Sequence, residues 1–285
     1  LFPGGPKVPF TPGFDIVGTV DKTGEEVSTS RMGQPVAVLT VTGGYAEYVC
    51  VPASDLVSVP PRLDPAEAVC LVLNYTAAYQ MLHHAAKIQA RESILIHGAG
   101  GGVGTALLQL GTLEKLKMYG TASRGKHELV SRLGGTPIDY RSENFVERIK
   151  TLTGEGVNAV FDPIGGTHWL ESYKALRKGG RLVPFGASCL MKQGQVQAGI
   201  GFLLIMMMKL LPDGKKALWL YGTKSGPYSS PDLCRKDLAL LLDLLKQKKI
   251  NPVIAERIPL AEAARAHELL ERGEMGGKIV LECGS

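Results

Sequence analysis

The chain has 285 residues, of which 45% are hydrophobic and 21% charged, and its formal net charge is +5. This length predicts two domains or one large domain, and the 35 glycines favour an α/β fold over a helical bundle. The positive charge is mild and scattered, so nucleic-acid binding is not indicated, and a pocket for an acidic small molecule would account for a few cations.

The first 60 residues have the pattern of short β-strands joined by turns. The stretch "FDIVGTVDKTG" (14–24) predicts a strand that runs into a turn, and "QPVAVLTVTGGYAEYVCVP" (34–52) predicts a hairpin. The chain opens on "LFPGGPKVPFTPG" (1–13), which has neither an initiator methionine nor a strand pattern. We therefore expect this start to lie partway through a domain.

From Asp64-Pro65 the pattern changes to an amphipathic helix that runs to about residue 88. Strands and helices then alternate. We expect helices that begin near residues 103, 125, 143 and 167, and strands at 93–98, 117–123, 136–140, 158–164 and 181–187. This βαβαβ series predicts a doubly wound parallel sheet.

The last third of the chain contains an apolar run, "AGIGFLLIMMMKLL" (198–211). It is shorter than the roughly 20 residues that span a bilayer, so it favours a buried or interface helix over a lid or a peripheral membrane contact. Next come a predicted buried strand "ALWLYG" (217–222), a helix at 231–249, a strand at 252–258, a helix from 260 and a final strand "GKIVLE" (277–282).

The cysteines form no CxxC pair and are odd in number: Cys50, Cys70, Cys189, Cys234 and Cys283. Neither a disulfide framework nor a cysteine-based zinc site is indicated, and free thiols point to a reducing compartment. No signal peptide or transmembrane span is predicted. We expect a cytoplasmic location, with an organelle left open because the natural N-terminus is not seen.

The stretch "SILIHGAGGGVGTALLQL" (93–110) places a glycine-rich loop between a predicted strand and a predicted helix. The spacing is Ala99-x-Gly101-x-x-Gly104, with further glycines at 98, 100 and 102. Such a loop turns sharply, lets a pyrophosphate lie against bare backbone and directs helix N–H groups at the anion. The sequence therefore predicts a dinucleotide site.

The following strand indicates which dinucleotide binds. It ends in Thr121-Ala122-Ser123, Arg124 and Lys126 follow, and no carboxylate occurs before Glu128. A carboxylate would hold a ribose 2′-hydroxyl, whereas a hydroxyl and two cations suit a 2′-phosphate. NADPH is the predicted cofactor; the alternative is that the two cations are ordinary solvated residues at a helix start.

Further segments follow one another in a characteristic series: "PFTPGFDIVGTV", "GGYAEYV", "NYTAAY", "HGAGGGVG", "GTASRGKHE", "PIDY", "FDPIGG", "GGRLVPFG" and "GGKIVLE". In order and spacing they resemble the medium-chain dehydrogenase/reductase superfamily. The branch they are most similar to is that of the zinc-independent quinone oxidoreductases, with zeta-crystallin and the vesicle amine transport protein homologue.

The resemblance implies a Rossmann domain at 74–226 and a β-rich GroES-like substrate domain at 1–73 and 227–285, the latter without its N-terminal part of roughly sixty residues. Where zinc alcohol dehydrogenases of this superfamily carry His-Glu, this chain has Phe14-Asp15. Phenylalanine cannot ligate a metal, so no catalytic metal is expected. The family also commonly forms homodimers through the edge of the nucleotide-binding sheet.

The resemblance further implies cofactor contacts. Thr76 would lie beside the cofactor, and the adenosine 2′-phosphate would be held by Ser123, Lys126 and Tyr140, with Arg124 as a further candidate. The other implied residues cradle the pyrophosphate or flank the nicotinamide: Gly101, Gly102, Val103, Gly104, Phe185, Gly186, Ser188, Leu220, Tyr221 and Gly222. The catalytic proton donor is not identified, with Tyr45 and Tyr75 as weak candidates, and His97 is expected to be structural.

The expected reaction is hydride transfer from NADPH to a small-molecule quinone or α,β-unsaturated carbonyl. Two alternatives remain open. One is an NADPH-binding protein with little or no turnover, like crystallin- or vesicle-associated relatives. The other is an enoyl-thioester reductase whose long pocket uses the apolar segment around residues 202–208.

Overall fold

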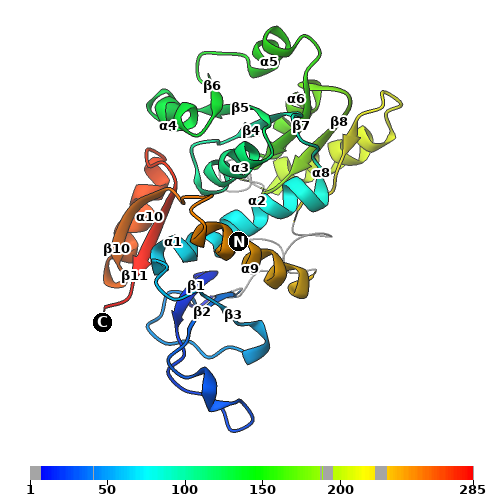
Figure 1. The fold of residues 1–285 in the computed structure, drawn as a ribbon. Coiled ribbons are helices and arrows are strands. Elements are labelled where there is room, and N and C mark those ends of the chain that lie inside the picture. The colour runs from blue at the N-terminus through cyan, green and yellow to red at the C-terminus, as the bar shows by residue number, and fades with distance from the viewer. Residues whose placement is uncertain (1–7, 41, 187, 189–194, 222–229, 285) are drawn as a thin grey trace. The chain divides into compact units, whose positions relative to one another are not determined.

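The computed structural model describes residues 8–40, 42–186, 188, 195–221 and 230–284 (Figure 1). The chain forms two compact units, one made of residues 1–76 and 231–285 and the other of residues 77–230. The first unit is therefore built from two separate stretches of sequence.

The first unit contains two small sheets. One is antiparallel, in the order β1 (Asp15–Thr19), β2 (Pro35–Leu39), β3 (Val57–Ser58), and the other is a parallel pair of β10 (Ile254–Pro259) and β11 (Lys278–Glu282). Its helices are α1 (Pro65–Cys70), α9 (Pro231–Lys246) and α10 (Ala263–Arg272). Helix α1 contacts strands of both sheets, and Ala66, Cys70 and Val280 form a small buried core between them.

Helix α1 begins where the sequence predicts. The Asp64 side chain accepts a hydrogen bond from the Ala66 N–H at 3.0 Å, and Pro65 occupies the first helical position, where a missing N–H costs nothing. The helical stretch continues through a π-helical turn (Leu71–Tyr75), α2 (Thr76–Gln80) and a second π-helical turn (Met81–Ala85).

The predicted hairpin at 34–52 is wrong in its second arm. Strand β2 forms, but its partners are β1 and β3, and residues 42–52 contain no strand. Instead Gly43, Gly44 and Tyr45 donate their N–H groups to the carbonyls of residues 11–13 at 2.8–3.1 Å. A Cβ on Gly13 would lie 2.7 Å from the backbone of Gly44, so glycine permits this close approach and draws the segment away from β2.

The second unit is built on the predicted parallel sheet, which has six strands in the order β6-β5-β4-β7-β8-β9. The strands are β4 (Ser93–His97), β5 (Lys117–Ala122), β6 (Gly135–Asp139), β7 (Val157–Asp162), β8 (Leu176–Pro184) and β9 (Lys216–Ala217). The first strand, β4, lies between β5 and β7, so the direction of winding reverses beside it. This is the doubly wound topology.

Helices cover both faces of this sheet (Figure 1). Helices α3 (Gly102–Leu113) and α4 (His127–Arg132) pack on one face. Helices α5 (Phe145–Thr153), α6 (His168–Lys174) and α8 (Gln195–Leu210) lie on the other, where Trp169, Tyr173 and Ile205 belong to a large buried core.

The predicted buried strand at 217–222 is present only as the short edge strand β9, Lys216–Ala217. The chain keeps two more hydrogen bonds to β8, from Leu218 N–H to the Leu182 carbonyl and from Tyr221 N–H to the Pro184 carbonyl. These two bonds are three residues apart on this segment, so residues 218–221 run beside β8 without forming a regular β-ladder with it.

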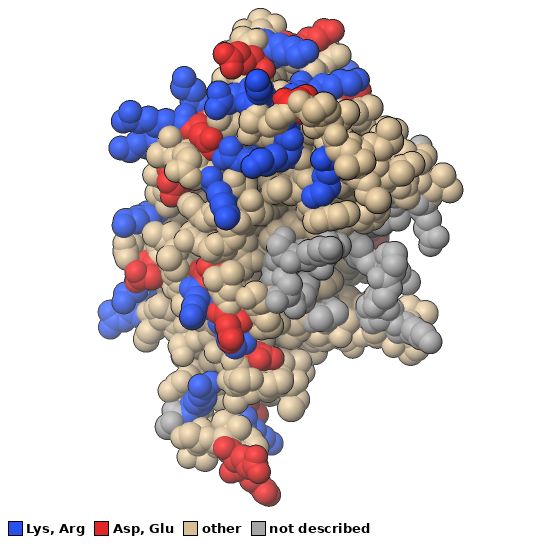
Figure 2. Space-filling model, turned by 90° about the vertical axis from the view of Figure 1, so that its right-hand side faces the viewer, with Lys and Arg blue, Asp and Glu red and all other residues tan. Residues whose placement is uncertain are grey.

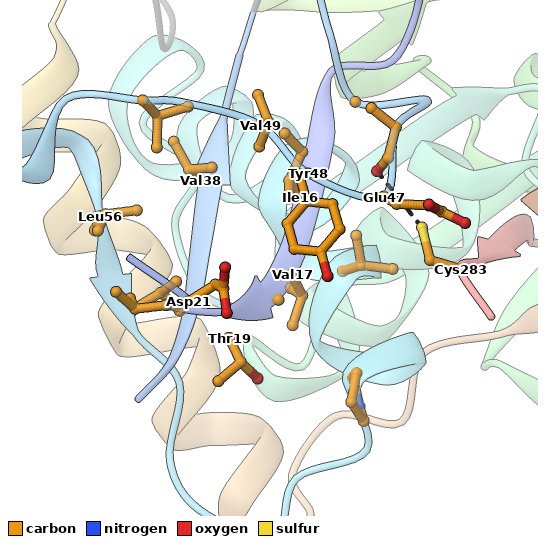
Figure 3. Close-up of a pocket in the computed structure, with 18 of the residues that line it drawn as sticks. Ile16, Val17, Thr19, Asp21, Val38, Glu47, Tyr48, Val49, Leu56 and Cys283 are labelled. Carbon is orange, nitrogen blue, oxygen red and sulfur yellow. Dashed lines mark hydrogen bonds between the residues drawn. The ribbon is translucent and has the colours of Figure 1, made fainter. Parts of the chain in front are cut away.

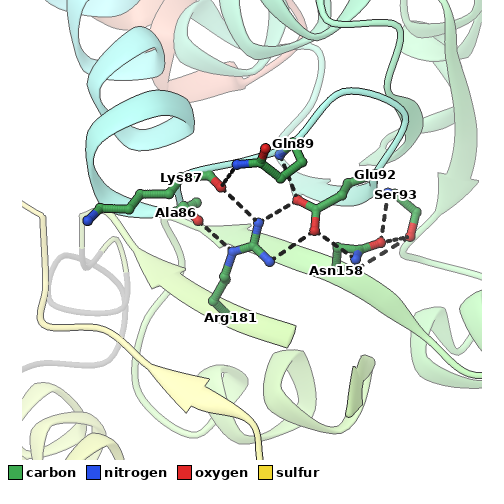
Figure 4. A network of polar contacts seen from close by, with 7 residues as sticks. All are labelled: Ala86, Lys87, Gln89, Glu92, Ser93, Asn158 and Arg181. Carbon is green, nitrogen blue, oxygen red and sulfur yellow. Dashed lines mark hydrogen bonds and ion pairs between the residues drawn. The ribbon is translucent and has the colours of Figure 1, made fainter. Parts of the chain in front are cut away.

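A polar network joins the amino ends of β4 and β7 to Arg181 in the middle of β8 (Figure 4). The Arg181 guanidinium donates to both carboxylate oxygens of Glu92, at 2.5 and 3.2 Å, and to the Ala86 carbonyl at 2.5 Å. Glu92 also accepts from the Asn158 amide at 3.0 Å, and Asn158 in turn accepts from Ser93. Burial alone would raise the pKa of Glu92, but the hydrogen bonds from Arg181 hold it below its usual value.

We expect the Glu92→Gln substitution to lower the free energy of unfolding by about 2 kcal/mol near neutral pH, because it leaves the mostly buried Arg181 without its counter-charge. Since the folded pKa of Glu92 is depressed, this stabilisation is full above the unfolded pKa and is lost as the pH falls through the folded pKa. Urea unfolding followed by tryptophan fluorescence measures it, because both tryptophans, Trp169 and Trp219, lie in the second unit. An equal difference between wild type and variant at neutral and acidic pH would contradict this account.

Candidate functional site

The carboxyl edge of the six-stranded sheet gathers most of the residues expected to hold a cofactor. In the strand register His97 lies opposite Thr121 at the ends of β4 and β5, and β7 on the other side of β4 ends at Asp162. Ligands of open α/β sheets bind at this edge, where the winding reverses.

The glycine loop after β4 comes into very close contact with helix α3. A Cβ on Gly104 would overlap the Gly98 carbonyl oxygen and would lie 2.6 Å from Ala99 Cα. Gly98 itself has a φ of 67°, and the Gly101 N–H donates to the Gly98 carbonyl at 2.9 Å. Glycine at 98 and 104 is thus what lets the loop turn and α3 begin against it.

The N-terminus of α3 is left open to a ligand. Gly101 is the residue before the helix, and it carries no side chain that could cap the first-turn N–H groups. Those donors, from Gly102, Val103 and Gly104, stand at the positive end of the helix dipole, where a pyrophosphate is stabilised.

Lys126 lies against this loop. A Cβ on Gly100 would be 2.7 Å from Lys126 Cδ and 3.0 Å from its Cβ, so the lysine stem packs on the bare backbone of Gly100. The loop is also tied to β5, because the Ala99 N–H donates to the Thr121 carbonyl at 3.0 Å. Burial lowers the pKa of Lys126, and the structure gives its ammonium no ion-pair partner among the described residues.

The other residues expected around the 2′-phosphate lie at the same edge. Ser123 follows β5 and Tyr140 follows β6, and the last paired residues of these adjacent strands are Ala122 and Asp139. Tyr140 is half-exposed, with its ring 5.8 Å from the Arg141 guanidinium. Arg124 is exposed beside Ser123.

The residues expected on the nicotinamide side follow β8 and β9. The Phe185 N–H donates to the Asp162 carbonyl and the Ser188 N–H to the Pro163 carbonyl, which ties this loop to the end of β7. Gly186 between them has a φ of 99°. Leu220 is buried and the Tyr221 hydroxyl donates to Gln80 Oε1 at 2.7 Å, whereas Gly222 lies outside the described residues.

Three further candidates belong to the first unit. Thr76 is fully buried and donates its hydroxyl to the Leu71 carbonyl at 2.9 Å. Tyr45 lies 3.3 Å from His267 Nε2, and burial raises the pKa of its hydroxyl. The Tyr75 hydroxyl is buried without a hydrogen-bond partner among the described residues, and burial raises its pKa strongly.

A buried polar cluster lies under the glycine loop. His97 contacts Thr121 Oγ1 at 3.0 Å with Nδ1 and Ser172 Oγ at 3.1 Å with Nε2, and burial lowers its pKa to about 3. Asp162 accepts hydrogen bonds from Ser172 at 2.6 Å and from His168 at 2.7 Å. Burial alone would raise the pKa of Asp162, but the bonds from His168 and Ser172 hold it below its usual value. His97 is therefore a neutral structural group.

The same cluster does not fit a metal ion well. Candidate ligand atoms of His97, Asp162 and His168 lie within 4.8 Å of one another, but the Ser172 hydroxyl already bridges His97 and Asp162. In the first unit Phe14 offers no donor atom and Asp15 pairs with Lys278. The pair that replaces His-Glu of the zinc enzymes is thus unsuited to zinc.

A hollow of about 1080 Å³ in the first unit has a different character (Figure 3). Its walls include apolar side chains such as Val17, Val38 and Leu56, and its charged members include Asp21 and Glu47. The start of α1, at Asp64 and Pro65, also lines this hollow, but the Asp64 side chain caps that helix end, so it suits a diphosphate less well than the uncapped start of α3.

Two features of the site were not anticipated from the residues. The packing of the Lys126 stem on Gly100 depends on a turn whose course the sequence does not specify. The second is the hydrogen bonding of Asp162 with His168 and Ser172. The sequence offered a signal for it, because a carboxylate at the carboxyl end of a buried strand lies at the edge of a parallel sheet where ligands bind.

Two family descriptions match the chain. The alcohol dehydrogenase GroES-like domain matches residues 2–61, and the zinc-binding dehydrogenase family matches residues 133–281, just over half of the chain. The first covers β1, β2 and β3 of the first unit, and the second covers β6 to β9 of the parallel sheet together with β10 and most of β11.

Among known proteins, the synaptic vesicle membrane protein VAT-1 homolog of Danio rerio is 32% identical over 97% of this chain, which spans only 58% of that relative's length. The Homo sapiens VAT-1 homolog is also 32% identical, with 98% of this chain and 72% of the relative covered. The rat quinone oxidoreductase is 28% identical over 97% of this chain and 81% of its own.

The solved structures include the Escherichia coli quinone oxidoreductase complexed with NADPH. It superposes with a TM-score of 0.84 at 26% identity, covering 98% of this chain and 84% of that one. Both the fold and the resemblance inferred from the sequence are confirmed. The chain belongs to the medium-chain dehydrogenase/reductase superfamily, in the branch of zinc-independent quinone oxidoreductases and VAT-1 homologs.

Proposed function

We propose that this oxidoreductase binds NADPH at the carboxyl edge of the six-stranded sheet. The observation that carries the proposal is the contact of Lys126 with the bare backbone of Gly100, beside the uncapped start of α3. The helix end suits a pyrophosphate and the lysine suits a 2′-phosphate. The NADPH named in the Escherichia coli structure supports the same choice.

The remaining cofactor contacts are proposed from position. Ser123, Tyr140 and Arg124 follow the strands beside the loop, and Phe185, Gly186, Ser188, Leu220 and Tyr221 follow β8 and β9. Thr76 stays a cofactor contact that only the family resemblance implies. The homodimer and the cytoplasmic or organellar location stay predictions.

NADPH would supply a hydride to a quinone or an α,β-unsaturated carbonyl. The chain must then supply a proton and hydrogen-bond donors for the developing negative charge. Tyr75 is one candidate proton donor, because its buried hydroxyl has no hydrogen-bond partner among the described residues. Tyr45 is the alternative, already hydrogen-bonded to His267.

The Lys126→Ala substitution should weaken NADPH binding by about 10- to 100-fold and NADH binding much less, because a charge-assisted bond to the 2′-phosphate is lost. Isothermal titration calorimetry with both cofactors measures this. Lys117→Ala is the matched control, since Lys117 is exposed at the opposite end of the same strand. Equal losses for NADPH and NADH would remove the 2′-phosphate assignment.

The Gly104→Ala substitution should reduce affinity for NADPH and NADH alike by at least about tenfold, because the new methyl group collides with Gly98 and moves the first turn of α3. Gly199→Ala, in α8 with open space around it, is the control and should leave affinity unchanged. If the Gly104→Ala variant binds NADPH and NADH as tightly as the wild type does, the glycine loop does not bind the diphosphate.

Turnover is tested by NADPH oxidation with phenanthrenequinone, a simple enone and a 2-enoyl thioester. We expect reduction of the quinone or the enone, unchanged by prior dialysis against a chelator, and a fall in kcat with the Tyr75→Phe variant at unchanged NADPH affinity. Tight NADPH binding without turnover would favour a binding protein, and a rate confined to the thioester would favour an enoyl-thioester reductase.

A further inference from the structure

A smaller hollow, of about 280 Å³, lies at the amino edge of the six-stranded sheet, the edge opposite to the glycine loop. Three cations line this amino-edge hollow. Arg91 lies in the turn before β4, Lys117 is the first residue of β5, and Arg177 is the second residue of β8. Strands β5, β4, β7 and β8 are neighbours in the sheet, so the hollow collects side chains from the starts of adjacent strands.

Backbone contacts fix the walls of the amino-edge hollow. The Lys117 N–H donates to the Glu92 carbonyl at 2.9 Å, which joins the start of β5 to the turn before β4. On the other side, Gly156 has a φ of 109°, and a Cβ on it would lie 2.7 Å from the Arg177 nitrogen. A glycine is therefore what lets the start of β8 approach the start of β7 and place Arg177 at the hollow.

The three cations have no counter-charge within the described part of the chain. The side chains of Arg91, Lys117 and Arg177 form neither an ion pair nor a hydrogen bond with any described residue. Glu155 lines the same hollow but pairs with none of them. Because like charges around one small space repel each other, an anion in the hollow would lower the free energy of the folded protein.

The balance of charge keeps the hollow positive. Glu155 offsets one of the three cations, and the C-terminal end of α5, at Thr153, contributes roughly half a negative charge through the helix dipole. The second unit as a whole has nearly twice as many Lys and Arg as Asp and Glu residues. Figure 2 shows Lys and Arg side chains gathered on one face of this unit. The surrounding field therefore also favours an anion.

Neutral donors line the same hollow. Tyr119 lies two residues after Lys117, on the same face of β5, and its hydroxyl has no hydrogen-bond partner among the described residues. Asn158 is only 8% exposed, and it accepts hydrogen bonds from Ser93 and donates one Nδ2 hydrogen to Glu92 (Figure 4). Its second Nδ2 hydrogen has no acceptor in the described part of the chain. The hollow thus offers hydrogen bonds as well as charge.

We propose that the amino-edge hollow binds a phosphate dianion, either free or as the end group of a small phosphate ester. The guanidinium groups of Arg91 and Arg177 match pairs of phosphate oxygens, and Lys117 adds a point charge. A phosphate monoester carries about −1.5 to −2 charges near neutral pH, which complements the net charge of the hollow. At about 280 Å³ the hollow is small for a dinucleotide, because pockets for drug-sized ligands span about 300–1,000 Å³.

The test is isothermal titration calorimetry of the full chain with inorganic phosphate, glycerol 3-phosphate and succinate, at constant ionic strength set with sodium chloride. We expect saturable binding of both phosphates with a Kd of about 1 mM or below, and weaker binding of the dicarboxylate. Tighter binding of glycerol 3-phosphate would identify an ester as the ligand, whereas equal or tighter binding of inorganic phosphate would identify the free ion.

The Arg91→Gln/Arg177→Gln variant should bind phosphate at least about tenfold more weakly, because two charge-assisted contacts are lost. Arg132→Gln/Lys178→Gln is the matched control. It removes the same charge from two exposed residues of the same unit that do not line the hollow, and it should bind phosphate like the wild type.

A crossed pair of variants separates this hollow from the cofactor site. Lys117→Ala should weaken phosphate binding and leave NADPH affinity unchanged, whereas Lys126→Ala should weaken NADPH binding and leave the phosphate site intact. Tryptophan fluorescence and the thermal midpoint without phosphate establish that each variant is folded. Failure of every variant to bind NADPH would count against the proposed cofactor site and not against this one.

The proposal is overturned if the wild type shows no saturable binding of either phosphate, or if it binds succinate more tightly. It is also overturned if the arginine variant and its matched control lose the same affinity, which would reduce the three cations to solvated surface charges. Loss of phosphate binding in Lys126→Ala alone would overturn it as well, since the anion would then lie at the glycine loop.

Discussion

The contact between Gly104 and the Gly98–Ala99 backbone is the constraint on which the rest of the site depends. Because no side chain fits there, helix α3 starts directly against the end of β4, and its first N–H groups remain without a capping side chain. The same absence of side chains lets the stem of Lys126 lie on Gly100. One local requirement for bare backbone thus sets both the helix end proposed for the diphosphate and the position of the cation that would recognise a third phosphate.

Buried polar groups stabilise the carboxyl edge of the six-stranded sheet. His97 joins Thr121 of β5 to Ser172 of α6, and Asp162 of β7 closes the cluster. A neutral imidazole with both nitrogens bonded is rigid and costs little to bury. The cluster therefore fixes the ends of three neighbouring strands relative to one another.

Much of this architecture was predictable because local patterns and packing agree. The alternation of strands and helices from residue 93 to residue 187 and the Asp64-Pro65 helix start come directly from residue types. The hairpin at 34–52 could not be predicted, because its second arm is drawn away by the mutual approach of Gly13 and Gly44, which are 31 residues apart in sequence. The apolar run at 198–211 was recognised, but only the structure separates its buried face from its exposed one. Likewise the residue types predict that Lys126 binds a phosphate, whereas the packing of its stem on Gly100 depends on the tertiary structure and could not be predicted.

The most direct test of the central claim is a calorimetric titration of the wild-type chain with NADPH and with NADH at two salt concentrations. The account predicts saturable heat for NADPH, tighter binding than for NADH, and a preference for NADPH that shrinks as salt screens the charge of Lys126. No heat with either reduced cofactor, or tighter binding of NADH, would contradict it.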